Sequence, residues 1–127
     1  MKLAYVALTA QRPQKLDRAL ALLAEAGNRV LRVSLPVVEV ETDLFPRQWA
    51  GRLRQIATKA GVNIEVVLYG NAIIDCAALT VPHPKLHRSR RLLAPMTELA
   101  PELRHPVLRK TMHELLGLAG RRETPDS

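Results

Sequence analysis

The sequence predicts a single α+β domain in which strands and helices follow one another in the order β-α-β-β-α-β. Short runs rich in β-branched residues alternate with longer stretches whose apolar residues recur every three or four positions, the spacing of an amphipathic helix. A proline opens each of these helical stretches and a glycine follows each of them, as is typical of helix ends. The order is that of ferredoxin-like folds, in which helices pack on an antiparallel sheet, and a further C-terminal helix is expected.

Each of the first six elements is predicted from a local pattern. Val38 and Val40 alternate with Glu39 and Glu41, so the third strand is expected to be half-buried. The second helix carries an apolar stripe that begins at Trp49. The predicted elements are a strand over residues 2–8, a helix over 13–26, strands over 29–35 and 38–42, a helix over 46–60, and a strand over 63–70.

The chain beyond residue 70 is less regular. Residues 72–81 are apolar and are expected to add a short strand. A final helix is expected over 107–118, with Leu108 on its apolar face. Residues 1–120 are therefore interpreted as one domain and residues 121–127 as a disordered polar tail. Five prolines are expected to break the intervening chain into short pieces: Pro82, Pro84, Pro95, Pro101 and Pro106.

Composition narrows the classes of function. Of 127 residues, 47% are hydrophobic, which is enough for a real core. The net charge of +7 favours an anionic partner, while an aromatic content of 3% argues against a nucleic-acid stacking platform. The sequence has no apolar run of transmembrane length, so no membrane association is expected. The single cysteine, Cys76, is expected in the core and suits a cytoplasmic location.

Two groups of residues are candidates for a functional site. Asn63 and Glu65 lie two residues apart at the start of a strand, so both fall on one face and could bind a hard cation such as Mg²⁺. Exposure of both side chains to solvent at a strand end is the alternative. The second group is a basic cluster, which could clamp a polyphosphate or could simply be a solvated loop. It comprises His83, Lys85, His87, Arg88, Arg90 and Arg91.

Several familiar sites are excluded. The four histidines do not fit a His-Glu-x-x-His pattern, and a single cysteine cannot complete a zinc site with them. There is no Gly-x-x-x-x-Gly-Lys-Ser/Thr loop, so the chain is not a P-loop nucleotide enzyme.

A longer set of motifs resembles one family. "LYG" at 68–70 is followed by "LTVPHPKLH" at 79–87, "LAPMTELAPEL" at 93–103 and "HPV" at 105–107. Together these blocks are similar to the hydroxymethyldihydropterin pyrophosphokinases of folate synthesis, and "VALTAQ" at 6–11 also fits. The resemblance covers nearly the whole chain.

The resemblance implies a ferredoxin-like enzyme that transfers the terminal diphosphate of ATP, with Mg²⁺, to the hydroxymethyl group of a reduced pterin. The metal-binding aspartate pair of the family falls on Asn63 and Glu65, which are thereby the implied catalytic and metal positions. Thr80 and His83 match residues near the nucleotide, and Val66 matches an apolar residue at its base.

The sequence also departs from the family pattern. Asn63 is neutral where the family has a carboxylate, and Glu65 is one methylene longer than aspartate. An arginine of the family falls on Ser89, although Arg88 and Arg90 flank that position and could replace it in nucleotide binding. The aromatic residue that packs on the pterin falls on Arg91.

Two loops are shorter than in the family. The flexible loop that covers the substrate is nearly absent around 34–37, and the catalytic loop is nearly absent between 60 and 63. Loops of this kind exclude water and complete a site. A pyrophosphokinase with reduced or altered activity is therefore one hypothesis. A non-catalytic relative that binds a nucleotide, a pterin or a protein partner is the second. A basic module that binds RNA or DNA through residues 85–91 is a third, and the low aromatic content counts against it. A homo-oligomer or partner chain that supplies the missing loops stays open.

Overall fold

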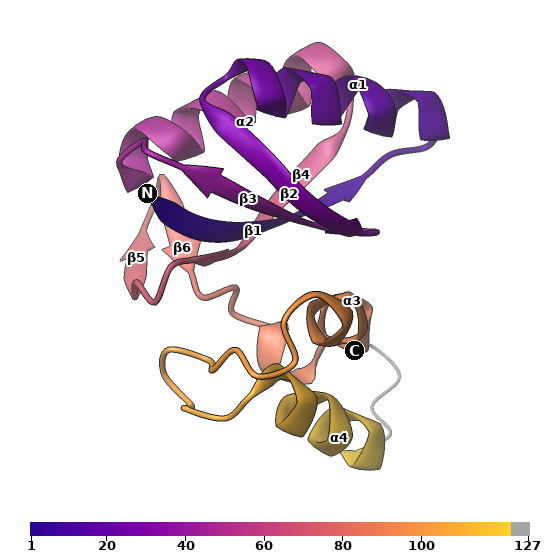
Figure 1. The fold of residues 1–127 in the computed structure, drawn as a ribbon, viewed down its shortest axis with the longest axis vertical. Helices are drawn as coiled ribbons and strands as arrows, with labels where there is room; N and C mark the ends of the chain where they lie inside the picture. The colour runs from indigo at the N-terminus through magenta and orange to yellow at the C-terminus, as the bar shows by residue number, and fades with distance from the viewer. Residues whose placement is uncertain (123–127) are drawn as a thin grey trace.

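The structure is a computed structural model that describes residues 1–122, and the side chains of residues 1–120. It contains a four-stranded sheet in the order β2-β3-β1-β4, a separate β5-β6 hairpin, four α-helices and a short 3₁₀ helix within the described residues (Figure 1). The strands are β1 (Lys2–Thr9), β2 (Asn28–Ser34), β3 (Val37–Thr42), β4 (Asn63–Tyr69), β5 (Ile74–Cys76) and β6 (Leu79–Val81). The helices are α1 (Pro13–Glu25), α2 (Pro46–Ala60), the 3₁₀ helix η1 (Leu86–Arg88), α3 (Arg90–Leu99) and α4 (Met112–Arg122).

The predicted ferredoxin-like class is confirmed. Strand β1 pairs antiparallel with both β3 and β4, and β2 pairs antiparallel with β3. Strands β2 and β4 therefore form the two edges of the sheet. Helices cover both of its faces, with α1 and α2 on one side and α3 and α4 on the other (Figure 1). None of the helices in the described part of the chain has the length and apolar character needed to cross a membrane.

Each face of the sheet has its own hydrophobic core. On the side of α1 and α2, Trp49 and Leu23 are fully buried against the sheet. On the side of α3 and α4, Leu93 and Met96 pack against Tyr5 and its neighbours. Because both faces are covered, side chains on either side of the central strands are removed from water.

The boundaries of the first two helices agree with the signals in the sequence. Pro13 and Pro46 occupy first-turn positions, where the missing amide proton costs nothing. Gly61 ends α2 in the left-handed backbone conformation, with a φ of 67°, which residues with a Cβ atom rarely adopt. The connection from α2 to β4 is consequently short, and β4 begins close to the end of α2.

The prediction that prolines break residues 82–106 into short pieces is wrong for residues 90–99, which form helix α3. Pro95 lies inside this ten-residue helix and is buried. An internal proline removes one helical hydrogen bond. Burial of Leu92, Leu93 and Met96 against the sheet offsets that loss.

The C-terminal helix begins later than predicted. Helix α4 starts at Met112, and Leu108 is 43% exposed in the preceding turn rather than on an apolar helical face. Thr111 and Glu114 form a reciprocal capping box, in which each backbone amide donates to the other's side chain. The helix continues to Arg122, into the segment predicted as a polar tail, and residues 123–127 lie outside the described residues.

Two further predictions about burial are wrong. Cys76 is exposed, because the stretch expected to form one strand is a hairpin and its β5 strand carries Cys76 outward. Glu39, expected on the open side of a half-buried strand, is only 3% exposed because the layer of α3 and α4 covers that face of the sheet.

Candidate functional site

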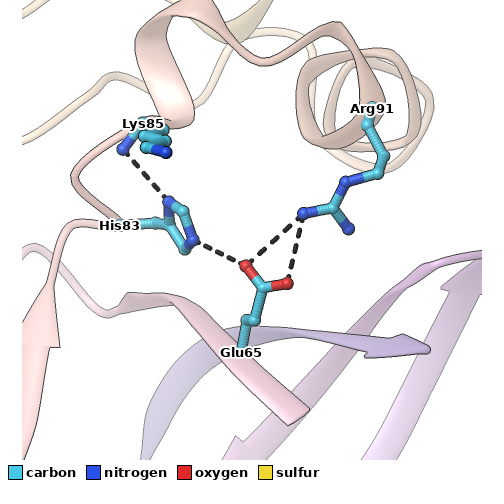
Figure 2. Close-up of polar contacts among 4 residues, drawn as sticks. All are labelled: Glu65, His83, Lys85 and Arg91. Carbon is cyan, nitrogen blue, oxygen red and sulfur yellow. Dashed lines mark hydrogen bonds and ion pairs between the residues drawn. The ribbon is translucent and has the colours of Figure 1, made fainter. Parts of the chain in front are cut away.

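The candidate site lies at the β4 edge of the sheet, where the chain returns from the β5-β6 hairpin. Glu65 is the third residue of β4 and faces Ala7 on β1 across the ladder. Its side chain is 28% exposed, so its carboxylate is accessible from one side. Glu65 points from β4 toward the segment that leads into α3 (Figure 2).

His83 is held beside Glu65 by the backbone. Its amide donates to the carbonyl of Val67 on β4, at 2.9 Å, so residue 83 runs alongside the strand. Its Nε2 lies 2.7 Å from Oε2 of Glu65, and its Nδ1 accepts from the backbone amide of Lys85 at 3.1 Å (Figure 2). Since Nδ1 accepts a hydrogen bond, the proton of the neutral ring is on Nε2 and is donated to Glu65.

Arg91 approaches the same carboxylate from the first turn of α3. Its Nη2 lies 3.2 Å from Oε1 and 3.4 Å from Oε2 of Glu65 (Figure 2). This ion pair is half-exposed, with the Arg91 side chain 44% accessible. Glu65 therefore contacts a neutral donor, His83, and a cation, Arg91.

A cavity of about 370 Å³ opens among these side chains. The N-terminal end of α3 faces it through Ser89, and no described side chain makes a capping hydrogen bond there. The positive end of a helix and its free amides favour an anion. The lining residues are Glu65, His83, Pro84, Lys85, Ser89 and Arg91.

A second groove, of about 500 Å³, lies between α2 and the start of β4. Asn63, which is exposed, and Val66 both line this groove, whereas Glu65 lines the cavity under α3. Much of the remaining groove wall is apolar, from Leu53 to Ala78. Asn63 and Glu65, which were expected to share one cation site, thus line two different hollows beside β4.

The other candidate residues lie outside both hollows. Thr80 is exposed on β6, opposite Asp75 of β5. Arg88 and Arg90 are exposed, and among the described residues neither lines the cavity under α3. Arg91, by contrast, lines it directly.

The residues present do not fit a magnesium site. Magnesium prefers carboxylate and other oxygen ligands in octahedral geometry. Glu65 supplies the single carboxylate here, and both of its oxygens are already contacted by Arg91. Within residues 1–122, no group of three or more potential metal-ligating side chains comes together.

Two features of the cavity were not predicted from the sequence. Arg91 was expected in the basic cluster and as a departure from an aromatic position, but its ion pair with Glu65 was not predicted. The uncapped start of α3 was not predicted, because Pro95 suggested that no helix formed there. The change from an aromatic residue to a cation at position 91 was the available signal for the ion pair.

Comparison with known proteins identifies several relatives that share a name. The chain is 34% identical over 94 residues to the 2-amino-4-hydroxy-6-hydroxymethyldihydropteridine pyrophosphokinase of Synechocystis sp., covering 71% of this chain and 47% of that protein. It is 30% identical over 78 residues to the Haemophilus influenzae protein of the same name, covering 53% and 49%. For the Aquifex aeolicus protein of that name, identity is 26% over 89 residues, covering 61% and 56%.

The chain spans about half the length of these three relatives. No family model matches it. The similarity nevertheless confirms the resemblance that the sequence motifs indicated.

Proposed function

Because this chain is a relative of the hydroxymethyldihydropterin pyrophosphokinases of folate synthesis, we propose that it transfers diphosphate from ATP to the hydroxymethyl group of a reduced pterin. The observation that carries the proposal is the direct contact of Glu65 and His83, at 2.7 Å. The resemblance assigns these residues to the catalytic centre and to the nucleotide site, and they lie in one cavity.

The nucleotide is proposed to bind across β4. The groove of Val66 and Leu53 has the apolar lining that suits a base. The cavity under α3 offers Lys85, Arg91 and a helix N-terminus to phosphate oxygens. The apolar and the cationic hollow would thus take opposite ends of one nucleotide.

The proposed reaction depends mainly on positioning and charge. The hydroxymethyl oxygen of the pterin attacks the β-phosphorus, a new C–O–P bond forms, and the bond between the β-phosphorus and the oxygen bridging to the α-phosphorus breaks. AMP leaves and the hydroxyl proton passes to solvent. Guanidinium and ammonium groups lower the barrier by stabilising charge on the transferred phosphates. No step is assigned to magnesium, because the donor set described above does not fit it.

A second function is favoured by the pairing of Glu65 with Arg91 and by a tight β2-β3 turn at Leu35 and Pro36. A carboxylate that already has a cation, together with shortened loops, suits a non-catalytic relative that binds nucleotide or pterin. Such a protein would bind these ligands without turnover.

Chromatographic detection of AMP separates the two functions. Purified protein is incubated with ATP and 6-hydroxymethyl-7,8-dihydropterin, with and without Mg²⁺, and AMP is expected only when both substrates are present. Glu65→Gln replaces the carboxylate that holds His83 and Arg91 in place, so it is expected to lower the rate at least about tenfold, equivalent to about 1.4 kcal/mol of activation free energy. Glu41→Gln, on β3 away from the cavity, is the matched control and should leave the rate unchanged.

Absence of AMP from the unaltered protein would reject the transferase proposal. Calorimetric titration with a non-hydrolysable ATP analogue and the pterin would then decide on the non-catalytic function. Heat of binding without turnover would support it, and no heat from either ligand would reject it.

A further inference from the structure

We propose that the guanidinium of Arg91 acts as a fixed cation beside Glu65, so that the cavity under α3 binds a polyphosphate chain without a divalent metal. The identification of that chain as the phosphates of a nucleotide rests on the proposed function. The binding of polyphosphate itself follows from the side chains of the cavity and can be tested separately.

The first step of the argument concerns the charge of Glu65. His83 donates from Nε2 while its Nδ1 accepts from the amide of Lys85, so the ring is a neutral donor. Among the described residues, Arg91 is therefore the cation that contacts the carboxylate, through 3.2 Å and 3.4 Å contacts from Nη2. The pair carries no net charge.

The second step concerns the donors that remain. A guanidinium has five N–H donors, and within the described part of the chain Arg91 uses only Nη2. Its Nε and Nη1 groups are thus available to a ligand in the same cavity. Lys85 and the start of α3 at Ser89 supply further positive charge at its wall. After Glu65 and Arg91 cancel, the cavity is cationic.

The third step concerns a metal. A divalent cation bound to Glu65 would lie against the guanidinium of Arg91, and like charges at such short separation repel. Either Arg91 must leave Glu65 or the metal is disfavoured. In the arrangement described, Arg91 provides the positive charge, and bidentate donors of this kind match phosphate oxygens.

Calorimetric titration with inorganic tripolyphosphate in the presence of EDTA tests the proposal on the full chain. Binding is expected without metal, and Arg91→Ala is expected to weaken it by at least roughly tenfold. In a second titration without EDTA, added Mg²⁺ should strengthen binding more in Arg91→Ala than in the unaltered protein, because the variant frees the Glu65 carboxylate. Arg91→Lys keeps the charge but not the fork, so its affinity should fall between the two.

Arg18→Ala is the matched control. It removes the same charge from an exposed position of α1, on the opposite face of the sheet, and should leave the affinity within about twofold of the unaltered protein. Circular dichroism verifies that each variant is folded. An equal loss of affinity in Arg18→Ala and Arg91→Ala would overturn the proposal, as would tripolyphosphate binding that requires Mg²⁺. Neither result would affect the AMP assay, so the two proposals fail independently.

Discussion

Glu39 and Glu65 are both paired with an arginine, but their surroundings differ. Glu39 is 3% exposed at the centre of the sheet, where the Tyr5 hydroxyl donates to Oε2 at 2.6 Å and Arg32 donates to both oxygens. Burial alone would raise the pKa of Glu39, but the hydrogen bonds from Arg32 and Tyr5 outweigh it and lower the pKa. Glu65 lies at a rim beside an open cavity. Glu39 is therefore a structural carboxylate, whereas Glu65 belongs to an ion pair that borders a cavity.

Replacing Glu39 by glutamine should make stability less dependent on pH. Because the pKa of Glu39 is lower in the folded protein, its stabilisation is complete above the unfolded-state pKa of about 4.3 and disappears as pH falls through the folded-state pKa. Glu39→Gln should cost about 1.5 kcal/mol at pH 7 and clearly less at pH 3. Urea unfolding at both pH values measures this difference.

The control for that experiment is Glu41→Gln on the same strand. Glu41 contacts Arg29 at 3.8 Å near the surface, and such pairs contribute little. A change within about 0.5 kcal/mol is expected at both pH values. A Glu39→Gln penalty that is equal at pH 7 and pH 3 would contradict the assigned network.

Single residues of the site were predictable only in part. The resemblance drew attention to Glu65 and His83, and the backbone bond of His83 to Val67 brings them together. Arg91 lies 26 positions after Glu65, so their ion pair depends on the packing of α3. No local pattern encodes that distance.

At the scale of elements, the start of α4 was predictable from a capping-box sequence. Thr111-Met112-His113-Glu114 is a capping-box sequence, which indicates a helix start five residues later than the apolar spacing suggested. The pKa of Glu114 is lowered by its hydrogen bonds to the backbone and side chain of Thr111. Helix α3, in contrast, was hidden by Pro95, and only its buried face reveals why it forms.

Removal of the cap of α4 should destabilise the protein modestly. Thr111→Ala deletes the hydroxyl that accepts from the Glu114 amide, and losses of this kind cost about 1 kcal/mol. The measurement is the midpoint of thermal unfolding, with His113→Ala, an exposed neighbour in the same turn, as the control. A midpoint that falls as far in His113→Ala as in Thr111→Ala would show that the cap is not responsible.

At the scale of the whole molecule, the two hydrophobic cores share one sheet. The element order was sufficient to predict the ferredoxin-like class with its antiparallel sheet, because few arrangements of β-α-β-β-α-β are compatible with short connections. The sequence did not predict that α3 and α4 would cover the second face of the sheet. This cover follows from long-range packing, and it is the reason that Glu39 is buried and that Arg91 reaches β4.

Both cores should unfold together. Leu23→Ala in the first core and Leu93→Ala in the second each remove a fully buried side chain, so each should cost about 2–5 kcal/mol. Trp49, the single tryptophan, lies in the first core and reports on it by fluorescence. In Leu93→Ala, fluorescence and circular dichroism should give coincident urea transitions.

A circular dichroism transition in Leu93→Ala that precedes the fluorescence transition would mean that the layer of α3 and α4 melts independently. Leu23→Ala provides the comparison, because its substitution and its reporter lie in the same core. If the fluorescence and circular dichroism transitions coincide in Leu23→Ala but not in Leu93→Ala, the packing between the sheet and α3 is the part that separates first.

Helix α3 is fastened to opposite edges of the sheet. At its start Arg91 contacts Glu65 on β4, and at its end Arg32 of β2 donates to the carbonyl of Leu99 while Ser34 donates to Glu98 at 2.7 Å. The β2 end of α3 is thus held by two contacts from different side chains, and the β4 end by the single ion pair of Arg91 with Glu65. Loss of that ion pair would leave the β2 end attached, so the β4 end of the helix, beside the cavity, would be the less constrained of the two.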